Sequence, residues 1–138
     1  MILRVAGALA LTGAAATLWA APAVAQDLAH FRSPSGNVGC VLDVDYVRCD
    51  ISERDWAPPA RPADCEFDYG QGLQMGVGEP ATFVCAGDTT LGGAEVLDYG
   101  QSIARGSLSC TSAESGMSCR DDATGTGFSI SREVYQLF

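Results

Sequence analysis

The chain has 138 residues, with 17 acidic residues against 8 basic ones and a formal net charge of −9 at pH 7. Such an acidic chain repels nucleic-acid phosphates and anionic lipid head groups, so both are poor candidate partners. Its 6 cysteines are even in number, which in a short exported chain indicates a disulfide framework.

The first residues have the pattern of a removable signal peptide. A long apolar stretch follows one early arginine, and Ala23-Val24-Ala25 supplies small residues just before an expected cleavage site at Gln26. The alternative, a retained membrane anchor, is disfavoured because the stretch is rich in alanine, whereas a spanning helix needs about 20 strongly apolar residues. We expect residues 1–25 to be removed, leaving one periplasmic or secreted domain over 26–138 with no membrane span.

The first predicted element is a hairpin over residues 38–51. Cys40 and Cys49 bracket an even number of residues, which lets them stand opposite each other within disulfide distance. That register creates one apolar face, made of Val38, Leu42, Val47 and Ile51. The other face is mostly polar and carries Arg48 and Asp50, as expected of a half-buried antiparallel pair. A shift by one residue would bury those two charged side chains instead.

The next segment connects this hairpin to the rest of the domain. Ser52 and Asp55 resemble a helix cap, which predicts one short helical turn. The proline-rich run over 57–62 then predicts a stiff, extended connection. We expect Trp56 to pack into the core beneath that connection rather than to line a binding site.

Short strands are predicted through the remaining chain. Residues 66–106 are glycine-rich with apolar alternations at 73–75, 81–85 and 95–97. A second hairpin follows, in which Cys110 stands opposite Cys119 and Leu108 opposite Asp121. The last residues predict a strand and then a strand or short helix. Its inward side chains would be Val134, Tyr135, Leu137 and Phe138.

These elements predict a small all-β domain: a disulfide-stabilised antiparallel sandwich or barrel with at most short helical turns. The two hairpins pair Cys40 with Cys49 and Cys110 with Cys119, which leaves Cys65 and Cys85 as partners by elimination. Spacing alone does not choose among the 15 possible pairings of six cysteines. In the loop-entropy treatment each bridge contributes about 3 kcal/mol, so the reduced protein should be marginally stable.

Signals for catalysis or for a cofactor are weak. His30 is the single histidine, expected in a loose arm, and no Gly-x-Ser-x-Gly nucleophile elbow accompanies it. No Cys-x-x-Cys spacing supports zinc binding, thiol redox chemistry or haem attachment, so we predict no metal, no cofactor and no catalytic residue.

Carboxylates are the remaining candidates for chemistry, either as an acid–base pair or as weak calcium ligands. The candidates are Asp43, Asp45, Asp50, Asp88, Asp121 and Asp122. The favoured explanation is that they are solvated residues of turns.

Several motifs carry a resemblance to a known family. They are Phe31–Cys40, Val47–Ile51, Phe83–Thr89, Tyr99–Ser102, Cys110–Cys119 and Gly127–Arg132. On these motifs the chain resembles a family of small exported bacterial proteins described only as a domain of unknown function. The resemblance implies export, one small domain and cysteines at these positions, and it carries over no activity or ligand.

The leading functional hypothesis is a non-enzymatic binding or structural module of the bacterial envelope, monomeric, whose partner is an envelope protein or glycan. One alternative is a small carboxylate-dependent hydrolase, which needs two acidic side chains within about 10 Å in a cleft. Another is an inhibitor of a secreted enzyme, which would present residues 43–46 or 113–116 as a braced loop.

Overall fold

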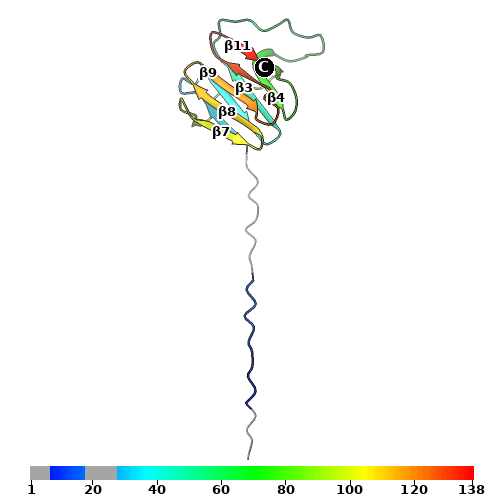
Figure 1. Ribbon diagram of the computed structural model, residues 1–138. Helices are drawn as coiled ribbons and strands as arrows, with labels where there is room; N and C mark the ends of the chain where they lie inside the picture. The colour runs from blue at the N-terminus through cyan, green and yellow to red at the C-terminus, as the bar shows by residue number, and fades with distance from the viewer. Residues whose placement is uncertain (1–6, 18–27) are drawn as a thin grey trace, which may run out of the picture.

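The computed structural model describes residues 7–17 and 28–138, and the cleavage site expected before Gln26 lies outside these ranges. Residues 7–17 form neither helix nor strand. From residue 28 onward, eleven strands and no helix form two sheets that pack face to face (Figure 1). The predicted small all-β, disulfide-stabilised fold is confirmed, and it is a sandwich.

The first sheet has six strands in the order β5-β4-β3-β2-β1-β6. Their bounds are β1 Ala29–Arg32, β2 Val38–Leu42, β3 Tyr46–Ile51, β4 Tyr69–Gly76, β5 Thr82–Cys85 and β6 Glu95–Val96. Neighbouring strands are antiparallel except β6, which pairs with β1 in parallel.

The second sheet has five antiparallel strands in the order β11-β10-β9-β8-β7. Their bounds are β7 Ser102–Arg105, β8 Leu108–Ala113, β9 Gly116–Asp121, β10 Gly127–Ile130 and β11 Tyr135–Leu137. Among the described residues the structure has no helix long and apolar enough to span a membrane.

Each sheet contains one of the two predicted hairpins, in the predicted register. In β2–β3, Cys40 stands opposite Cys49, and Val38 opposite Ile51. In β8–β9, Cys110 stands opposite Cys119. The apolar face of each hairpin points toward the other sheet, because only that orientation removes its side chains from water.

The core lies between the sheets and is centred on two disulfides. The structure joins Cys40 to Cys49, Cys65 to Cys85, and Cys110 to Cys119. The sulfurs of Cys49 and Cys119 lie 3.7 Å apart, so the bridges of the two hairpins contact each other across the sandwich. Large apolar side chains from both sheets surround them, and these include Phe31, Leu42, Leu73, Leu108, Met117 and Phe128.

The outer face of the first sheet differs from the prediction. It was expected to meet solvent, yet Arg48 is 6% exposed and Asp50 is fully covered. The segment between β5 and β6 crosses this face: a Cβ added to Gly39 would lie 2.5 Å from the Thr90 carbonyl oxygen. The strand therefore needs glycine here, because the covering backbone approaches too closely for a side chain.

An aromatic cluster closes one open side of the sandwich. Trp56 lies 4.8 Å from Tyr135 of β11, and Phe83 of β5 lies 5.0 Å from the same ring, centroid to centroid. The indole nitrogen of Trp56 donates to the Ser131 carbonyl at 2.8 Å. Trp56 thus packs against the core as predicted, and it joins edge strands of the two sheets.

The predicted inward set at the C-terminus is wrong for three of its four members. Tyr135 packs against the core, but Val134, Leu137 and Phe138 are each about half exposed. The reason is that β11 is the edge strand of its sheet and pairs only with β10.

The predicted helical turn at 52–55 is also wrong, because other partners use the backbone groups that a helix would need. The side-chain amide of Asn37 donates to the Glu53 carbonyl and accepts from the Glu53 amide. The Asp55 amide donates to the Arg132 carbonyl at 2.8 Å.

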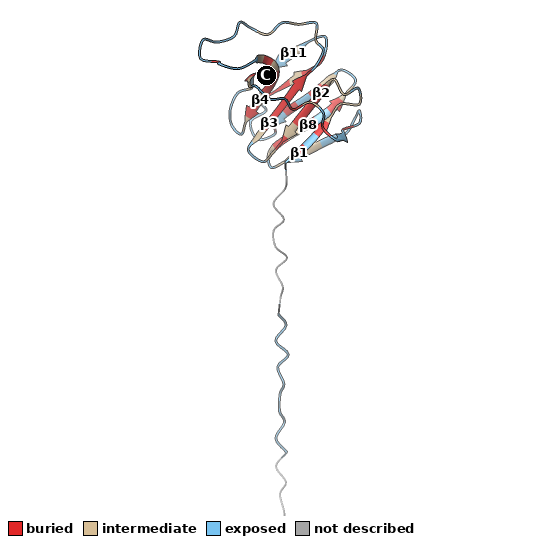
Figure 2. Cartoon of the chain, turned by 180° about the vertical axis from the view of Figure 1, so that it is seen from behind, coloured by how far each residue is buried: buried red, intermediate tan, exposed pale blue. Residues whose placement is uncertain are grey.

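The proline-rich connection forms a broad loop that projects from the sandwich (Figures 1 and 2). Residues 59–64 and 66–68 are exposed, and none of them belongs to a helix or strand. The loop is fixed near both ends: the Pro58 ring packs over Gly70, and Cys65 is bonded to Cys85.

Candidate functional site

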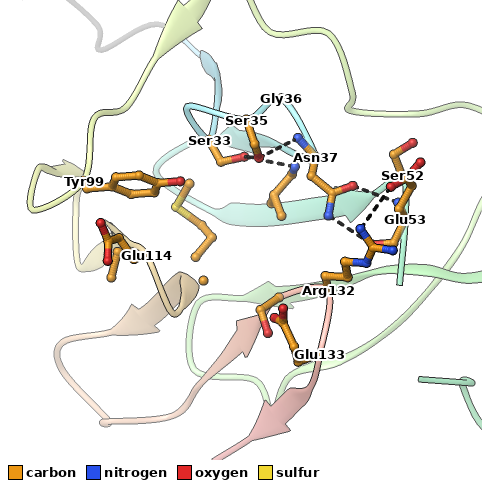
Figure 3. A pocket seen from close by; sticks show the side chains of 15 residues that line it. Ser33, Ser35, Gly36, Asn37, Ser52, Glu53, Tyr99, Glu114, Arg132 and Glu133 are labelled. Carbon is orange, nitrogen blue, oxygen red and sulfur yellow. Dashed lines mark hydrogen bonds and ion pairs between the residues drawn. The ribbon is translucent and has the colours of Figure 1, made fainter. Parts of the chain in front are cut away.

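A cleft of about 510 Å³ lies at one end of the sandwich. Five loop regions from both sheets surround it: the β1–β2 turn, the residues after β3, the segment before β7, the β8–β9 turn and the β10–β11 connection. The cleft is open to solvent and has polar and apolar lining (Figure 3). Loops at the end of a rigid sandwich are where binding residues commonly lie.

The floor of the cleft is apolar. Val38 of β2 and Met117 of β9 line it, and they are 4% and 1% exposed. They belong to the hydrophobic core, which fixes their positions. The cleft therefore has an apolar floor that is fixed by core packing, and polar side chains surround its opening.

One side of the opening carries Tyr99 and Glu114, which lie close together in Figure 3. Tyr99 lies in Asp98–Gln101, the second copy of an Asp-Tyr-Gly-Gln sequence that first occurs at 68–71, and it is 49% exposed. The backbone beside it is fixed, because the Gly100 amide donates to the Ser112 carbonyl at 2.7 Å. Glu114 is exposed at the tip of the β8–β9 turn.

The other side carries Asn37, Glu53 and Arg132, and these residues bind one another (Figure 3). The Asn37 amide is used on both its atoms by the Glu53 backbone. Arg132 forms ion pairs with Glu53 at 3.5 Å and with Asp55 at 3.6 Å. Hydrogen bonds and ion pairs therefore join the residues on this side, and the positive charge of Arg132 is neutralised by Glu53 and Asp55.

The serines of the β1–β2 turn are also engaged. The Ser33 hydroxyl oxygen accepts from the Val38 amide, and that of Ser35 accepts from the Asn37 amide. By contrast, Glu114 and Glu133 have no hydrogen bond or ion pair with any residue that the structure describes. The groups available to a ligand are therefore the Glu114 and Glu133 carboxylates, the Tyr99 phenol and the Ser52 hydroxyl.

A buried polar network lies on the outer face of the first sheet, away from the cleft. Arg48 binds both oxygens of Asp50, at 2.9 and 2.8 Å, and reaches the Asp88 carboxylate at 2.9 Å. The Thr90 amide donates to Asp50, and the Thr90 hydroxyl donates to the Gly39 carbonyl. The network attaches the covering segment to the sheet.

The charges of this network stabilise one another. Burial lowers the pKa of Arg48, but the hydrogen bonds to Asp50 and Asp88 outweigh it and raise the pKa overall. The hydrogen bond from Arg48 lowers the pKa of the Asp88 carboxyl. The network therefore places the Arg48 guanidinium group between the carboxyl groups of Asp50 and Asp88.

A second cavity, of about 460 Å³, lies beside this network. It is lined by Arg54, Asp68, Tyr69, Gln71, Gly87, Asp88 and Thr89. The Gln71 amide donates to the Ala86 carbonyl at 2.9 Å, and Arg54 donates to the Gly70 carbonyl. Gln71 of β4 thereby holds the segment that follows β5, and Arg54 is attached to the backbone of β4.

Of the six candidate aspartates, the structure brings Asp50 and Asp88 together on Arg48. Asp50 is fully covered, and its oxygens are occupied by Arg48 and Thr90, so this pair holds the covering segment. Asp121 is also fully covered, and it accepts from the amides of Gly78 and Ala123. The expectation of solvated turn residues is wrong for Asp50 and Asp121.

The other candidate carboxylates remain at the surface. Asp122 pairs with Arg120 at 3.2 Å, and Asp43 accepts from the amide of the next residue. Asp45 is exposed in the β2–β3 turn. Among the described residues, one group of three potential metal-ligand side chains converges, namely Cys40, Cys49 and Cys119, and their sulfurs are held in disulfides.

His30 is not in a loose arm. It lies in β1, and its ring nitrogen Nε2 is 2.9 Å from the Thr90 carbonyl oxygen. The histidine thus helps to hold the same covering segment as Asp50. Strand pairing extends closer to the start of the domain than the sequence pattern indicated.

Sequence reasoning named the 113–116 turn, which carries Glu114, but it missed Tyr99, Arg132 and Glu133 as cleft residues. In the sequence, Tyr99 and Arg132 stand out only as members of the motifs Tyr99–Ser102 and Gly127–Arg132, and Glu133 lies in the predicted C-terminal strand or short helix. The local sequence offers no signal that these segments meet, because their proximity depends on the packing of the two sheets.

Comparisons with known proteins give a family but no characterised relative. A family model described as "Family of unknown function (DUF6636)" matches residues 10–138, which is nearly the whole chain. A search of curated proteins found no match. A search of solved structures also found none.

Proposed function

Because the chain belongs to DUF6636, a family of unknown function, we propose a function from its geometry: it is a non-enzymatic binding module of the bacterial envelope. The observation that carries the proposal is the cleft at the end of the sandwich. It combines a rigid apolar floor with polar side chains that face solvent, which is the usual composition of a ligand site.

The scaffold around the cleft supports binding rather than large movement. Two disulfides at the centre of the core fix the β2–β3 and β8–β9 hairpins, and the β8–β9 turn forms one wall of the cleft. A preformed site loses little conformational entropy when a ligand binds. Three disulfides also fit an oxidising compartment such as the periplasm or the extracellular medium.

A bulky substitution in the cleft tests the proposal. Ser52 lines the cleft and is exposed, so Ser52→Trp should obstruct it without disturbing the core. Ser118→Trp on the exposed face of β9 is the matched control. The wild type and the two variants, all with their disulfides formed, serve as baits for affinity capture from the native envelope. Each captured molecule is then purified, and its affinity for the three proteins is measured by titration.

We expect one protein or glycan to bind the wild type and Ser118→Trp and to lose at least tenfold in affinity for Ser52→Trp. Equal binding to all three proteins would contradict the cleft as the binding site. Far-ultraviolet circular dichroism checks that both variants keep the fold.

A second candidate function is inhibition of, or docking to, a secreted enzyme, and one observation favours it. Besides the bridge-closed turns 43–46 and 113–116, the structure has a longer exposed loop that a bridge fixes, the 57–68 connection. Its prolines reduce the entropy cost of binding in an extended conformation. Deleting residues 59–62 and measuring inhibition across a panel of secreted hydrolases tests this candidate, and unchanged inhibition in the deletion variant would contradict it.

A further inference from the structure

We infer that the cleft binds a cationic side chain, lysine or arginine, presented on an extended peptide segment of a partner protein. The inference rests on the proposed binding function and assigns the ligand class. It follows from which polar groups in the cleft are already occupied and which remain available.

Apart from the hydroxyl of Ser52, the serine and asparagine groups discussed above already have partners. The amide of Asn37 is used on both atoms by the Glu53 backbone. The Ser33 and Ser35 hydroxyls accept from backbone amides and lie 3.3 Å from each other. A glycan would have to share these groups with their present partners, because each already takes part in a hydrogen bond within the chain.

The available groups suit a cation. Arg132 is paired with Glu53 and Asp55, so it adds no free positive charge to the cleft. Glu114 and Glu133 also line the cleft, and within the described chain neither has a hydrogen-bonding or ionic partner. The cleft therefore presents two unneutralised carboxylates to a ligand.

The aromatic and apolar groups fit the rest of such a side chain. The half-exposed Tyr99 ring can stack on an ammonium or guanidinium group. Val38 and Met117 form a floor against which the methylene stem of lysine or arginine can pack. The net charge of the whole chain, −9, would also steer basic segments toward it.

Nuclear magnetic resonance titration of the oxidised, folded protein tests the inference with three probes. The first is acetyl-Gly-Lys-Gly-amide, the second is the same peptide with norleucine in place of lysine, and the third is chitotetraose as a neutral glycan. We expect saturable shifts at Tyr99, Glu114, Met117 and Glu133 with the lysine peptide, and at least tenfold weaker binding of the norleucine peptide.

Charge-neutral variants locate the binding. Glu114→Gln and Glu133→Gln should each weaken binding of the lysine peptide by about threefold, the size expected for an exposed ion pair. Tyr99→Leu should weaken it by a similar factor, whereas Tyr99→Phe retains the ring and should not. Glu95→Gln on β6 removes the same charge away from the cleft and should leave the affinity unchanged.

Each contrary result has a distinct meaning. Equal binding of the lysine and norleucine peptides, or equal weakening by Glu95→Gln and Glu114→Gln, would overturn the inference. Binding of chitotetraose but not of the lysine peptide, with loss in Ser52→Trp, would overturn the ligand class and leave the cleft as a binding site. If Ser52→Trp had no effect on any probe or captured partner, the proposed function would fail as well.

Discussion

Arg48 is the residue that joins the covering segment to the first sheet, since it binds Asp50 and Asp88 at once. Replacing it by methionine leaves the covered Asp50 carboxylate without its cation. Removing one partner of a buried ion pair typically costs 3–5 kcal/mol. We therefore expect Arg48→Met to lower the free energy of unfolding by about 3 kcal/mol in urea denaturation.

Two further variants separate this effect from simple loss of packing. The double variant Arg48→Met with Asp50→Leu removes both charges and should be more stable than Arg48→Met alone. Asp88→Asn should change stability little, because the Asp88 side chain is 80% exposed. A double variant less stable than the single one would contradict the role given to the ion pair.

Gly39 gives a second test at the residue scale. A Cβ at this position would meet the Thr90 carbonyl oxygen at 2.5 Å and the Leu91 Cα at 2.7 Å. Gly39→Ala should therefore displace the covering segment, lower the melting temperature and speed hydrogen exchange of the Thr90 amide. Gly87→Ala is the control, since its nearest contact would be an ordinary 3.5 Å, and it should behave like the wild type.

Among the elements, the 57–68 loop depends most on a single covalent bond. Replacing Cys65 and Cys85 by alanine should lower the free energy of unfolding by about 3 kcal/mol in urea, the loop-entropy value for a bridge of this span. The sandwich should still form, because its two central bridges remain. Chymotrypsin should then cleave after the exposed Phe67 faster than in the wild type. Unchanged cleavage would show that packing of Pro58 on Gly70 is enough to hold the loop.

For the whole molecule, stability should depend on acid pH. Hydrogen bonds from the backbone amides of Gly78 and Ala123 lower the pKa of the Asp121 carboxyl. In the unfolded chain an aspartate has a pKa of about 3.9. Below that value the unfolded state takes up protons that the native state does not, so stability falls as the pH decreases.

The corresponding measurement is the melting temperature between pH 7 and pH 2. We expect a nearly constant value above about pH 5 and a decline below pH 4. Asp121→Asn should be less stable than the wild type at pH 7 and should show a shallower decline. Parallel curves for the two proteins would contradict the contribution of Asp121.

The sequence predicted the parts of this fold whose determinants are local. The β2–β3 register followed from the alternation of Val38, Cys40 and Leu42, because alternate residues share a face of a strand. The burial of Arg48 and Asp50 could not be predicted in this way, since it depends on Thr90, forty residues farther along the chain. The cleft likewise depends on five loop regions that meet only when the sheets pack.

The contact between the sulfurs of Cys49 and Cys119 has a consequence for how the protein responds to a reducing agent. Both central bridges have no exposed surface, whereas Cys85 of the third bridge is partly accessible. Mild reductant should therefore open Cys65–Cys85 first, and the other two bridges only when the whole sandwich opens. Because the two bridges contact each other in one core, opening of the sandwich exposes both together to attack by the reductant's thiolate. The folded fraction should then fall in one steep step as the reductant concentration rises, and molecules that keep only one of the two central bridges should not accumulate.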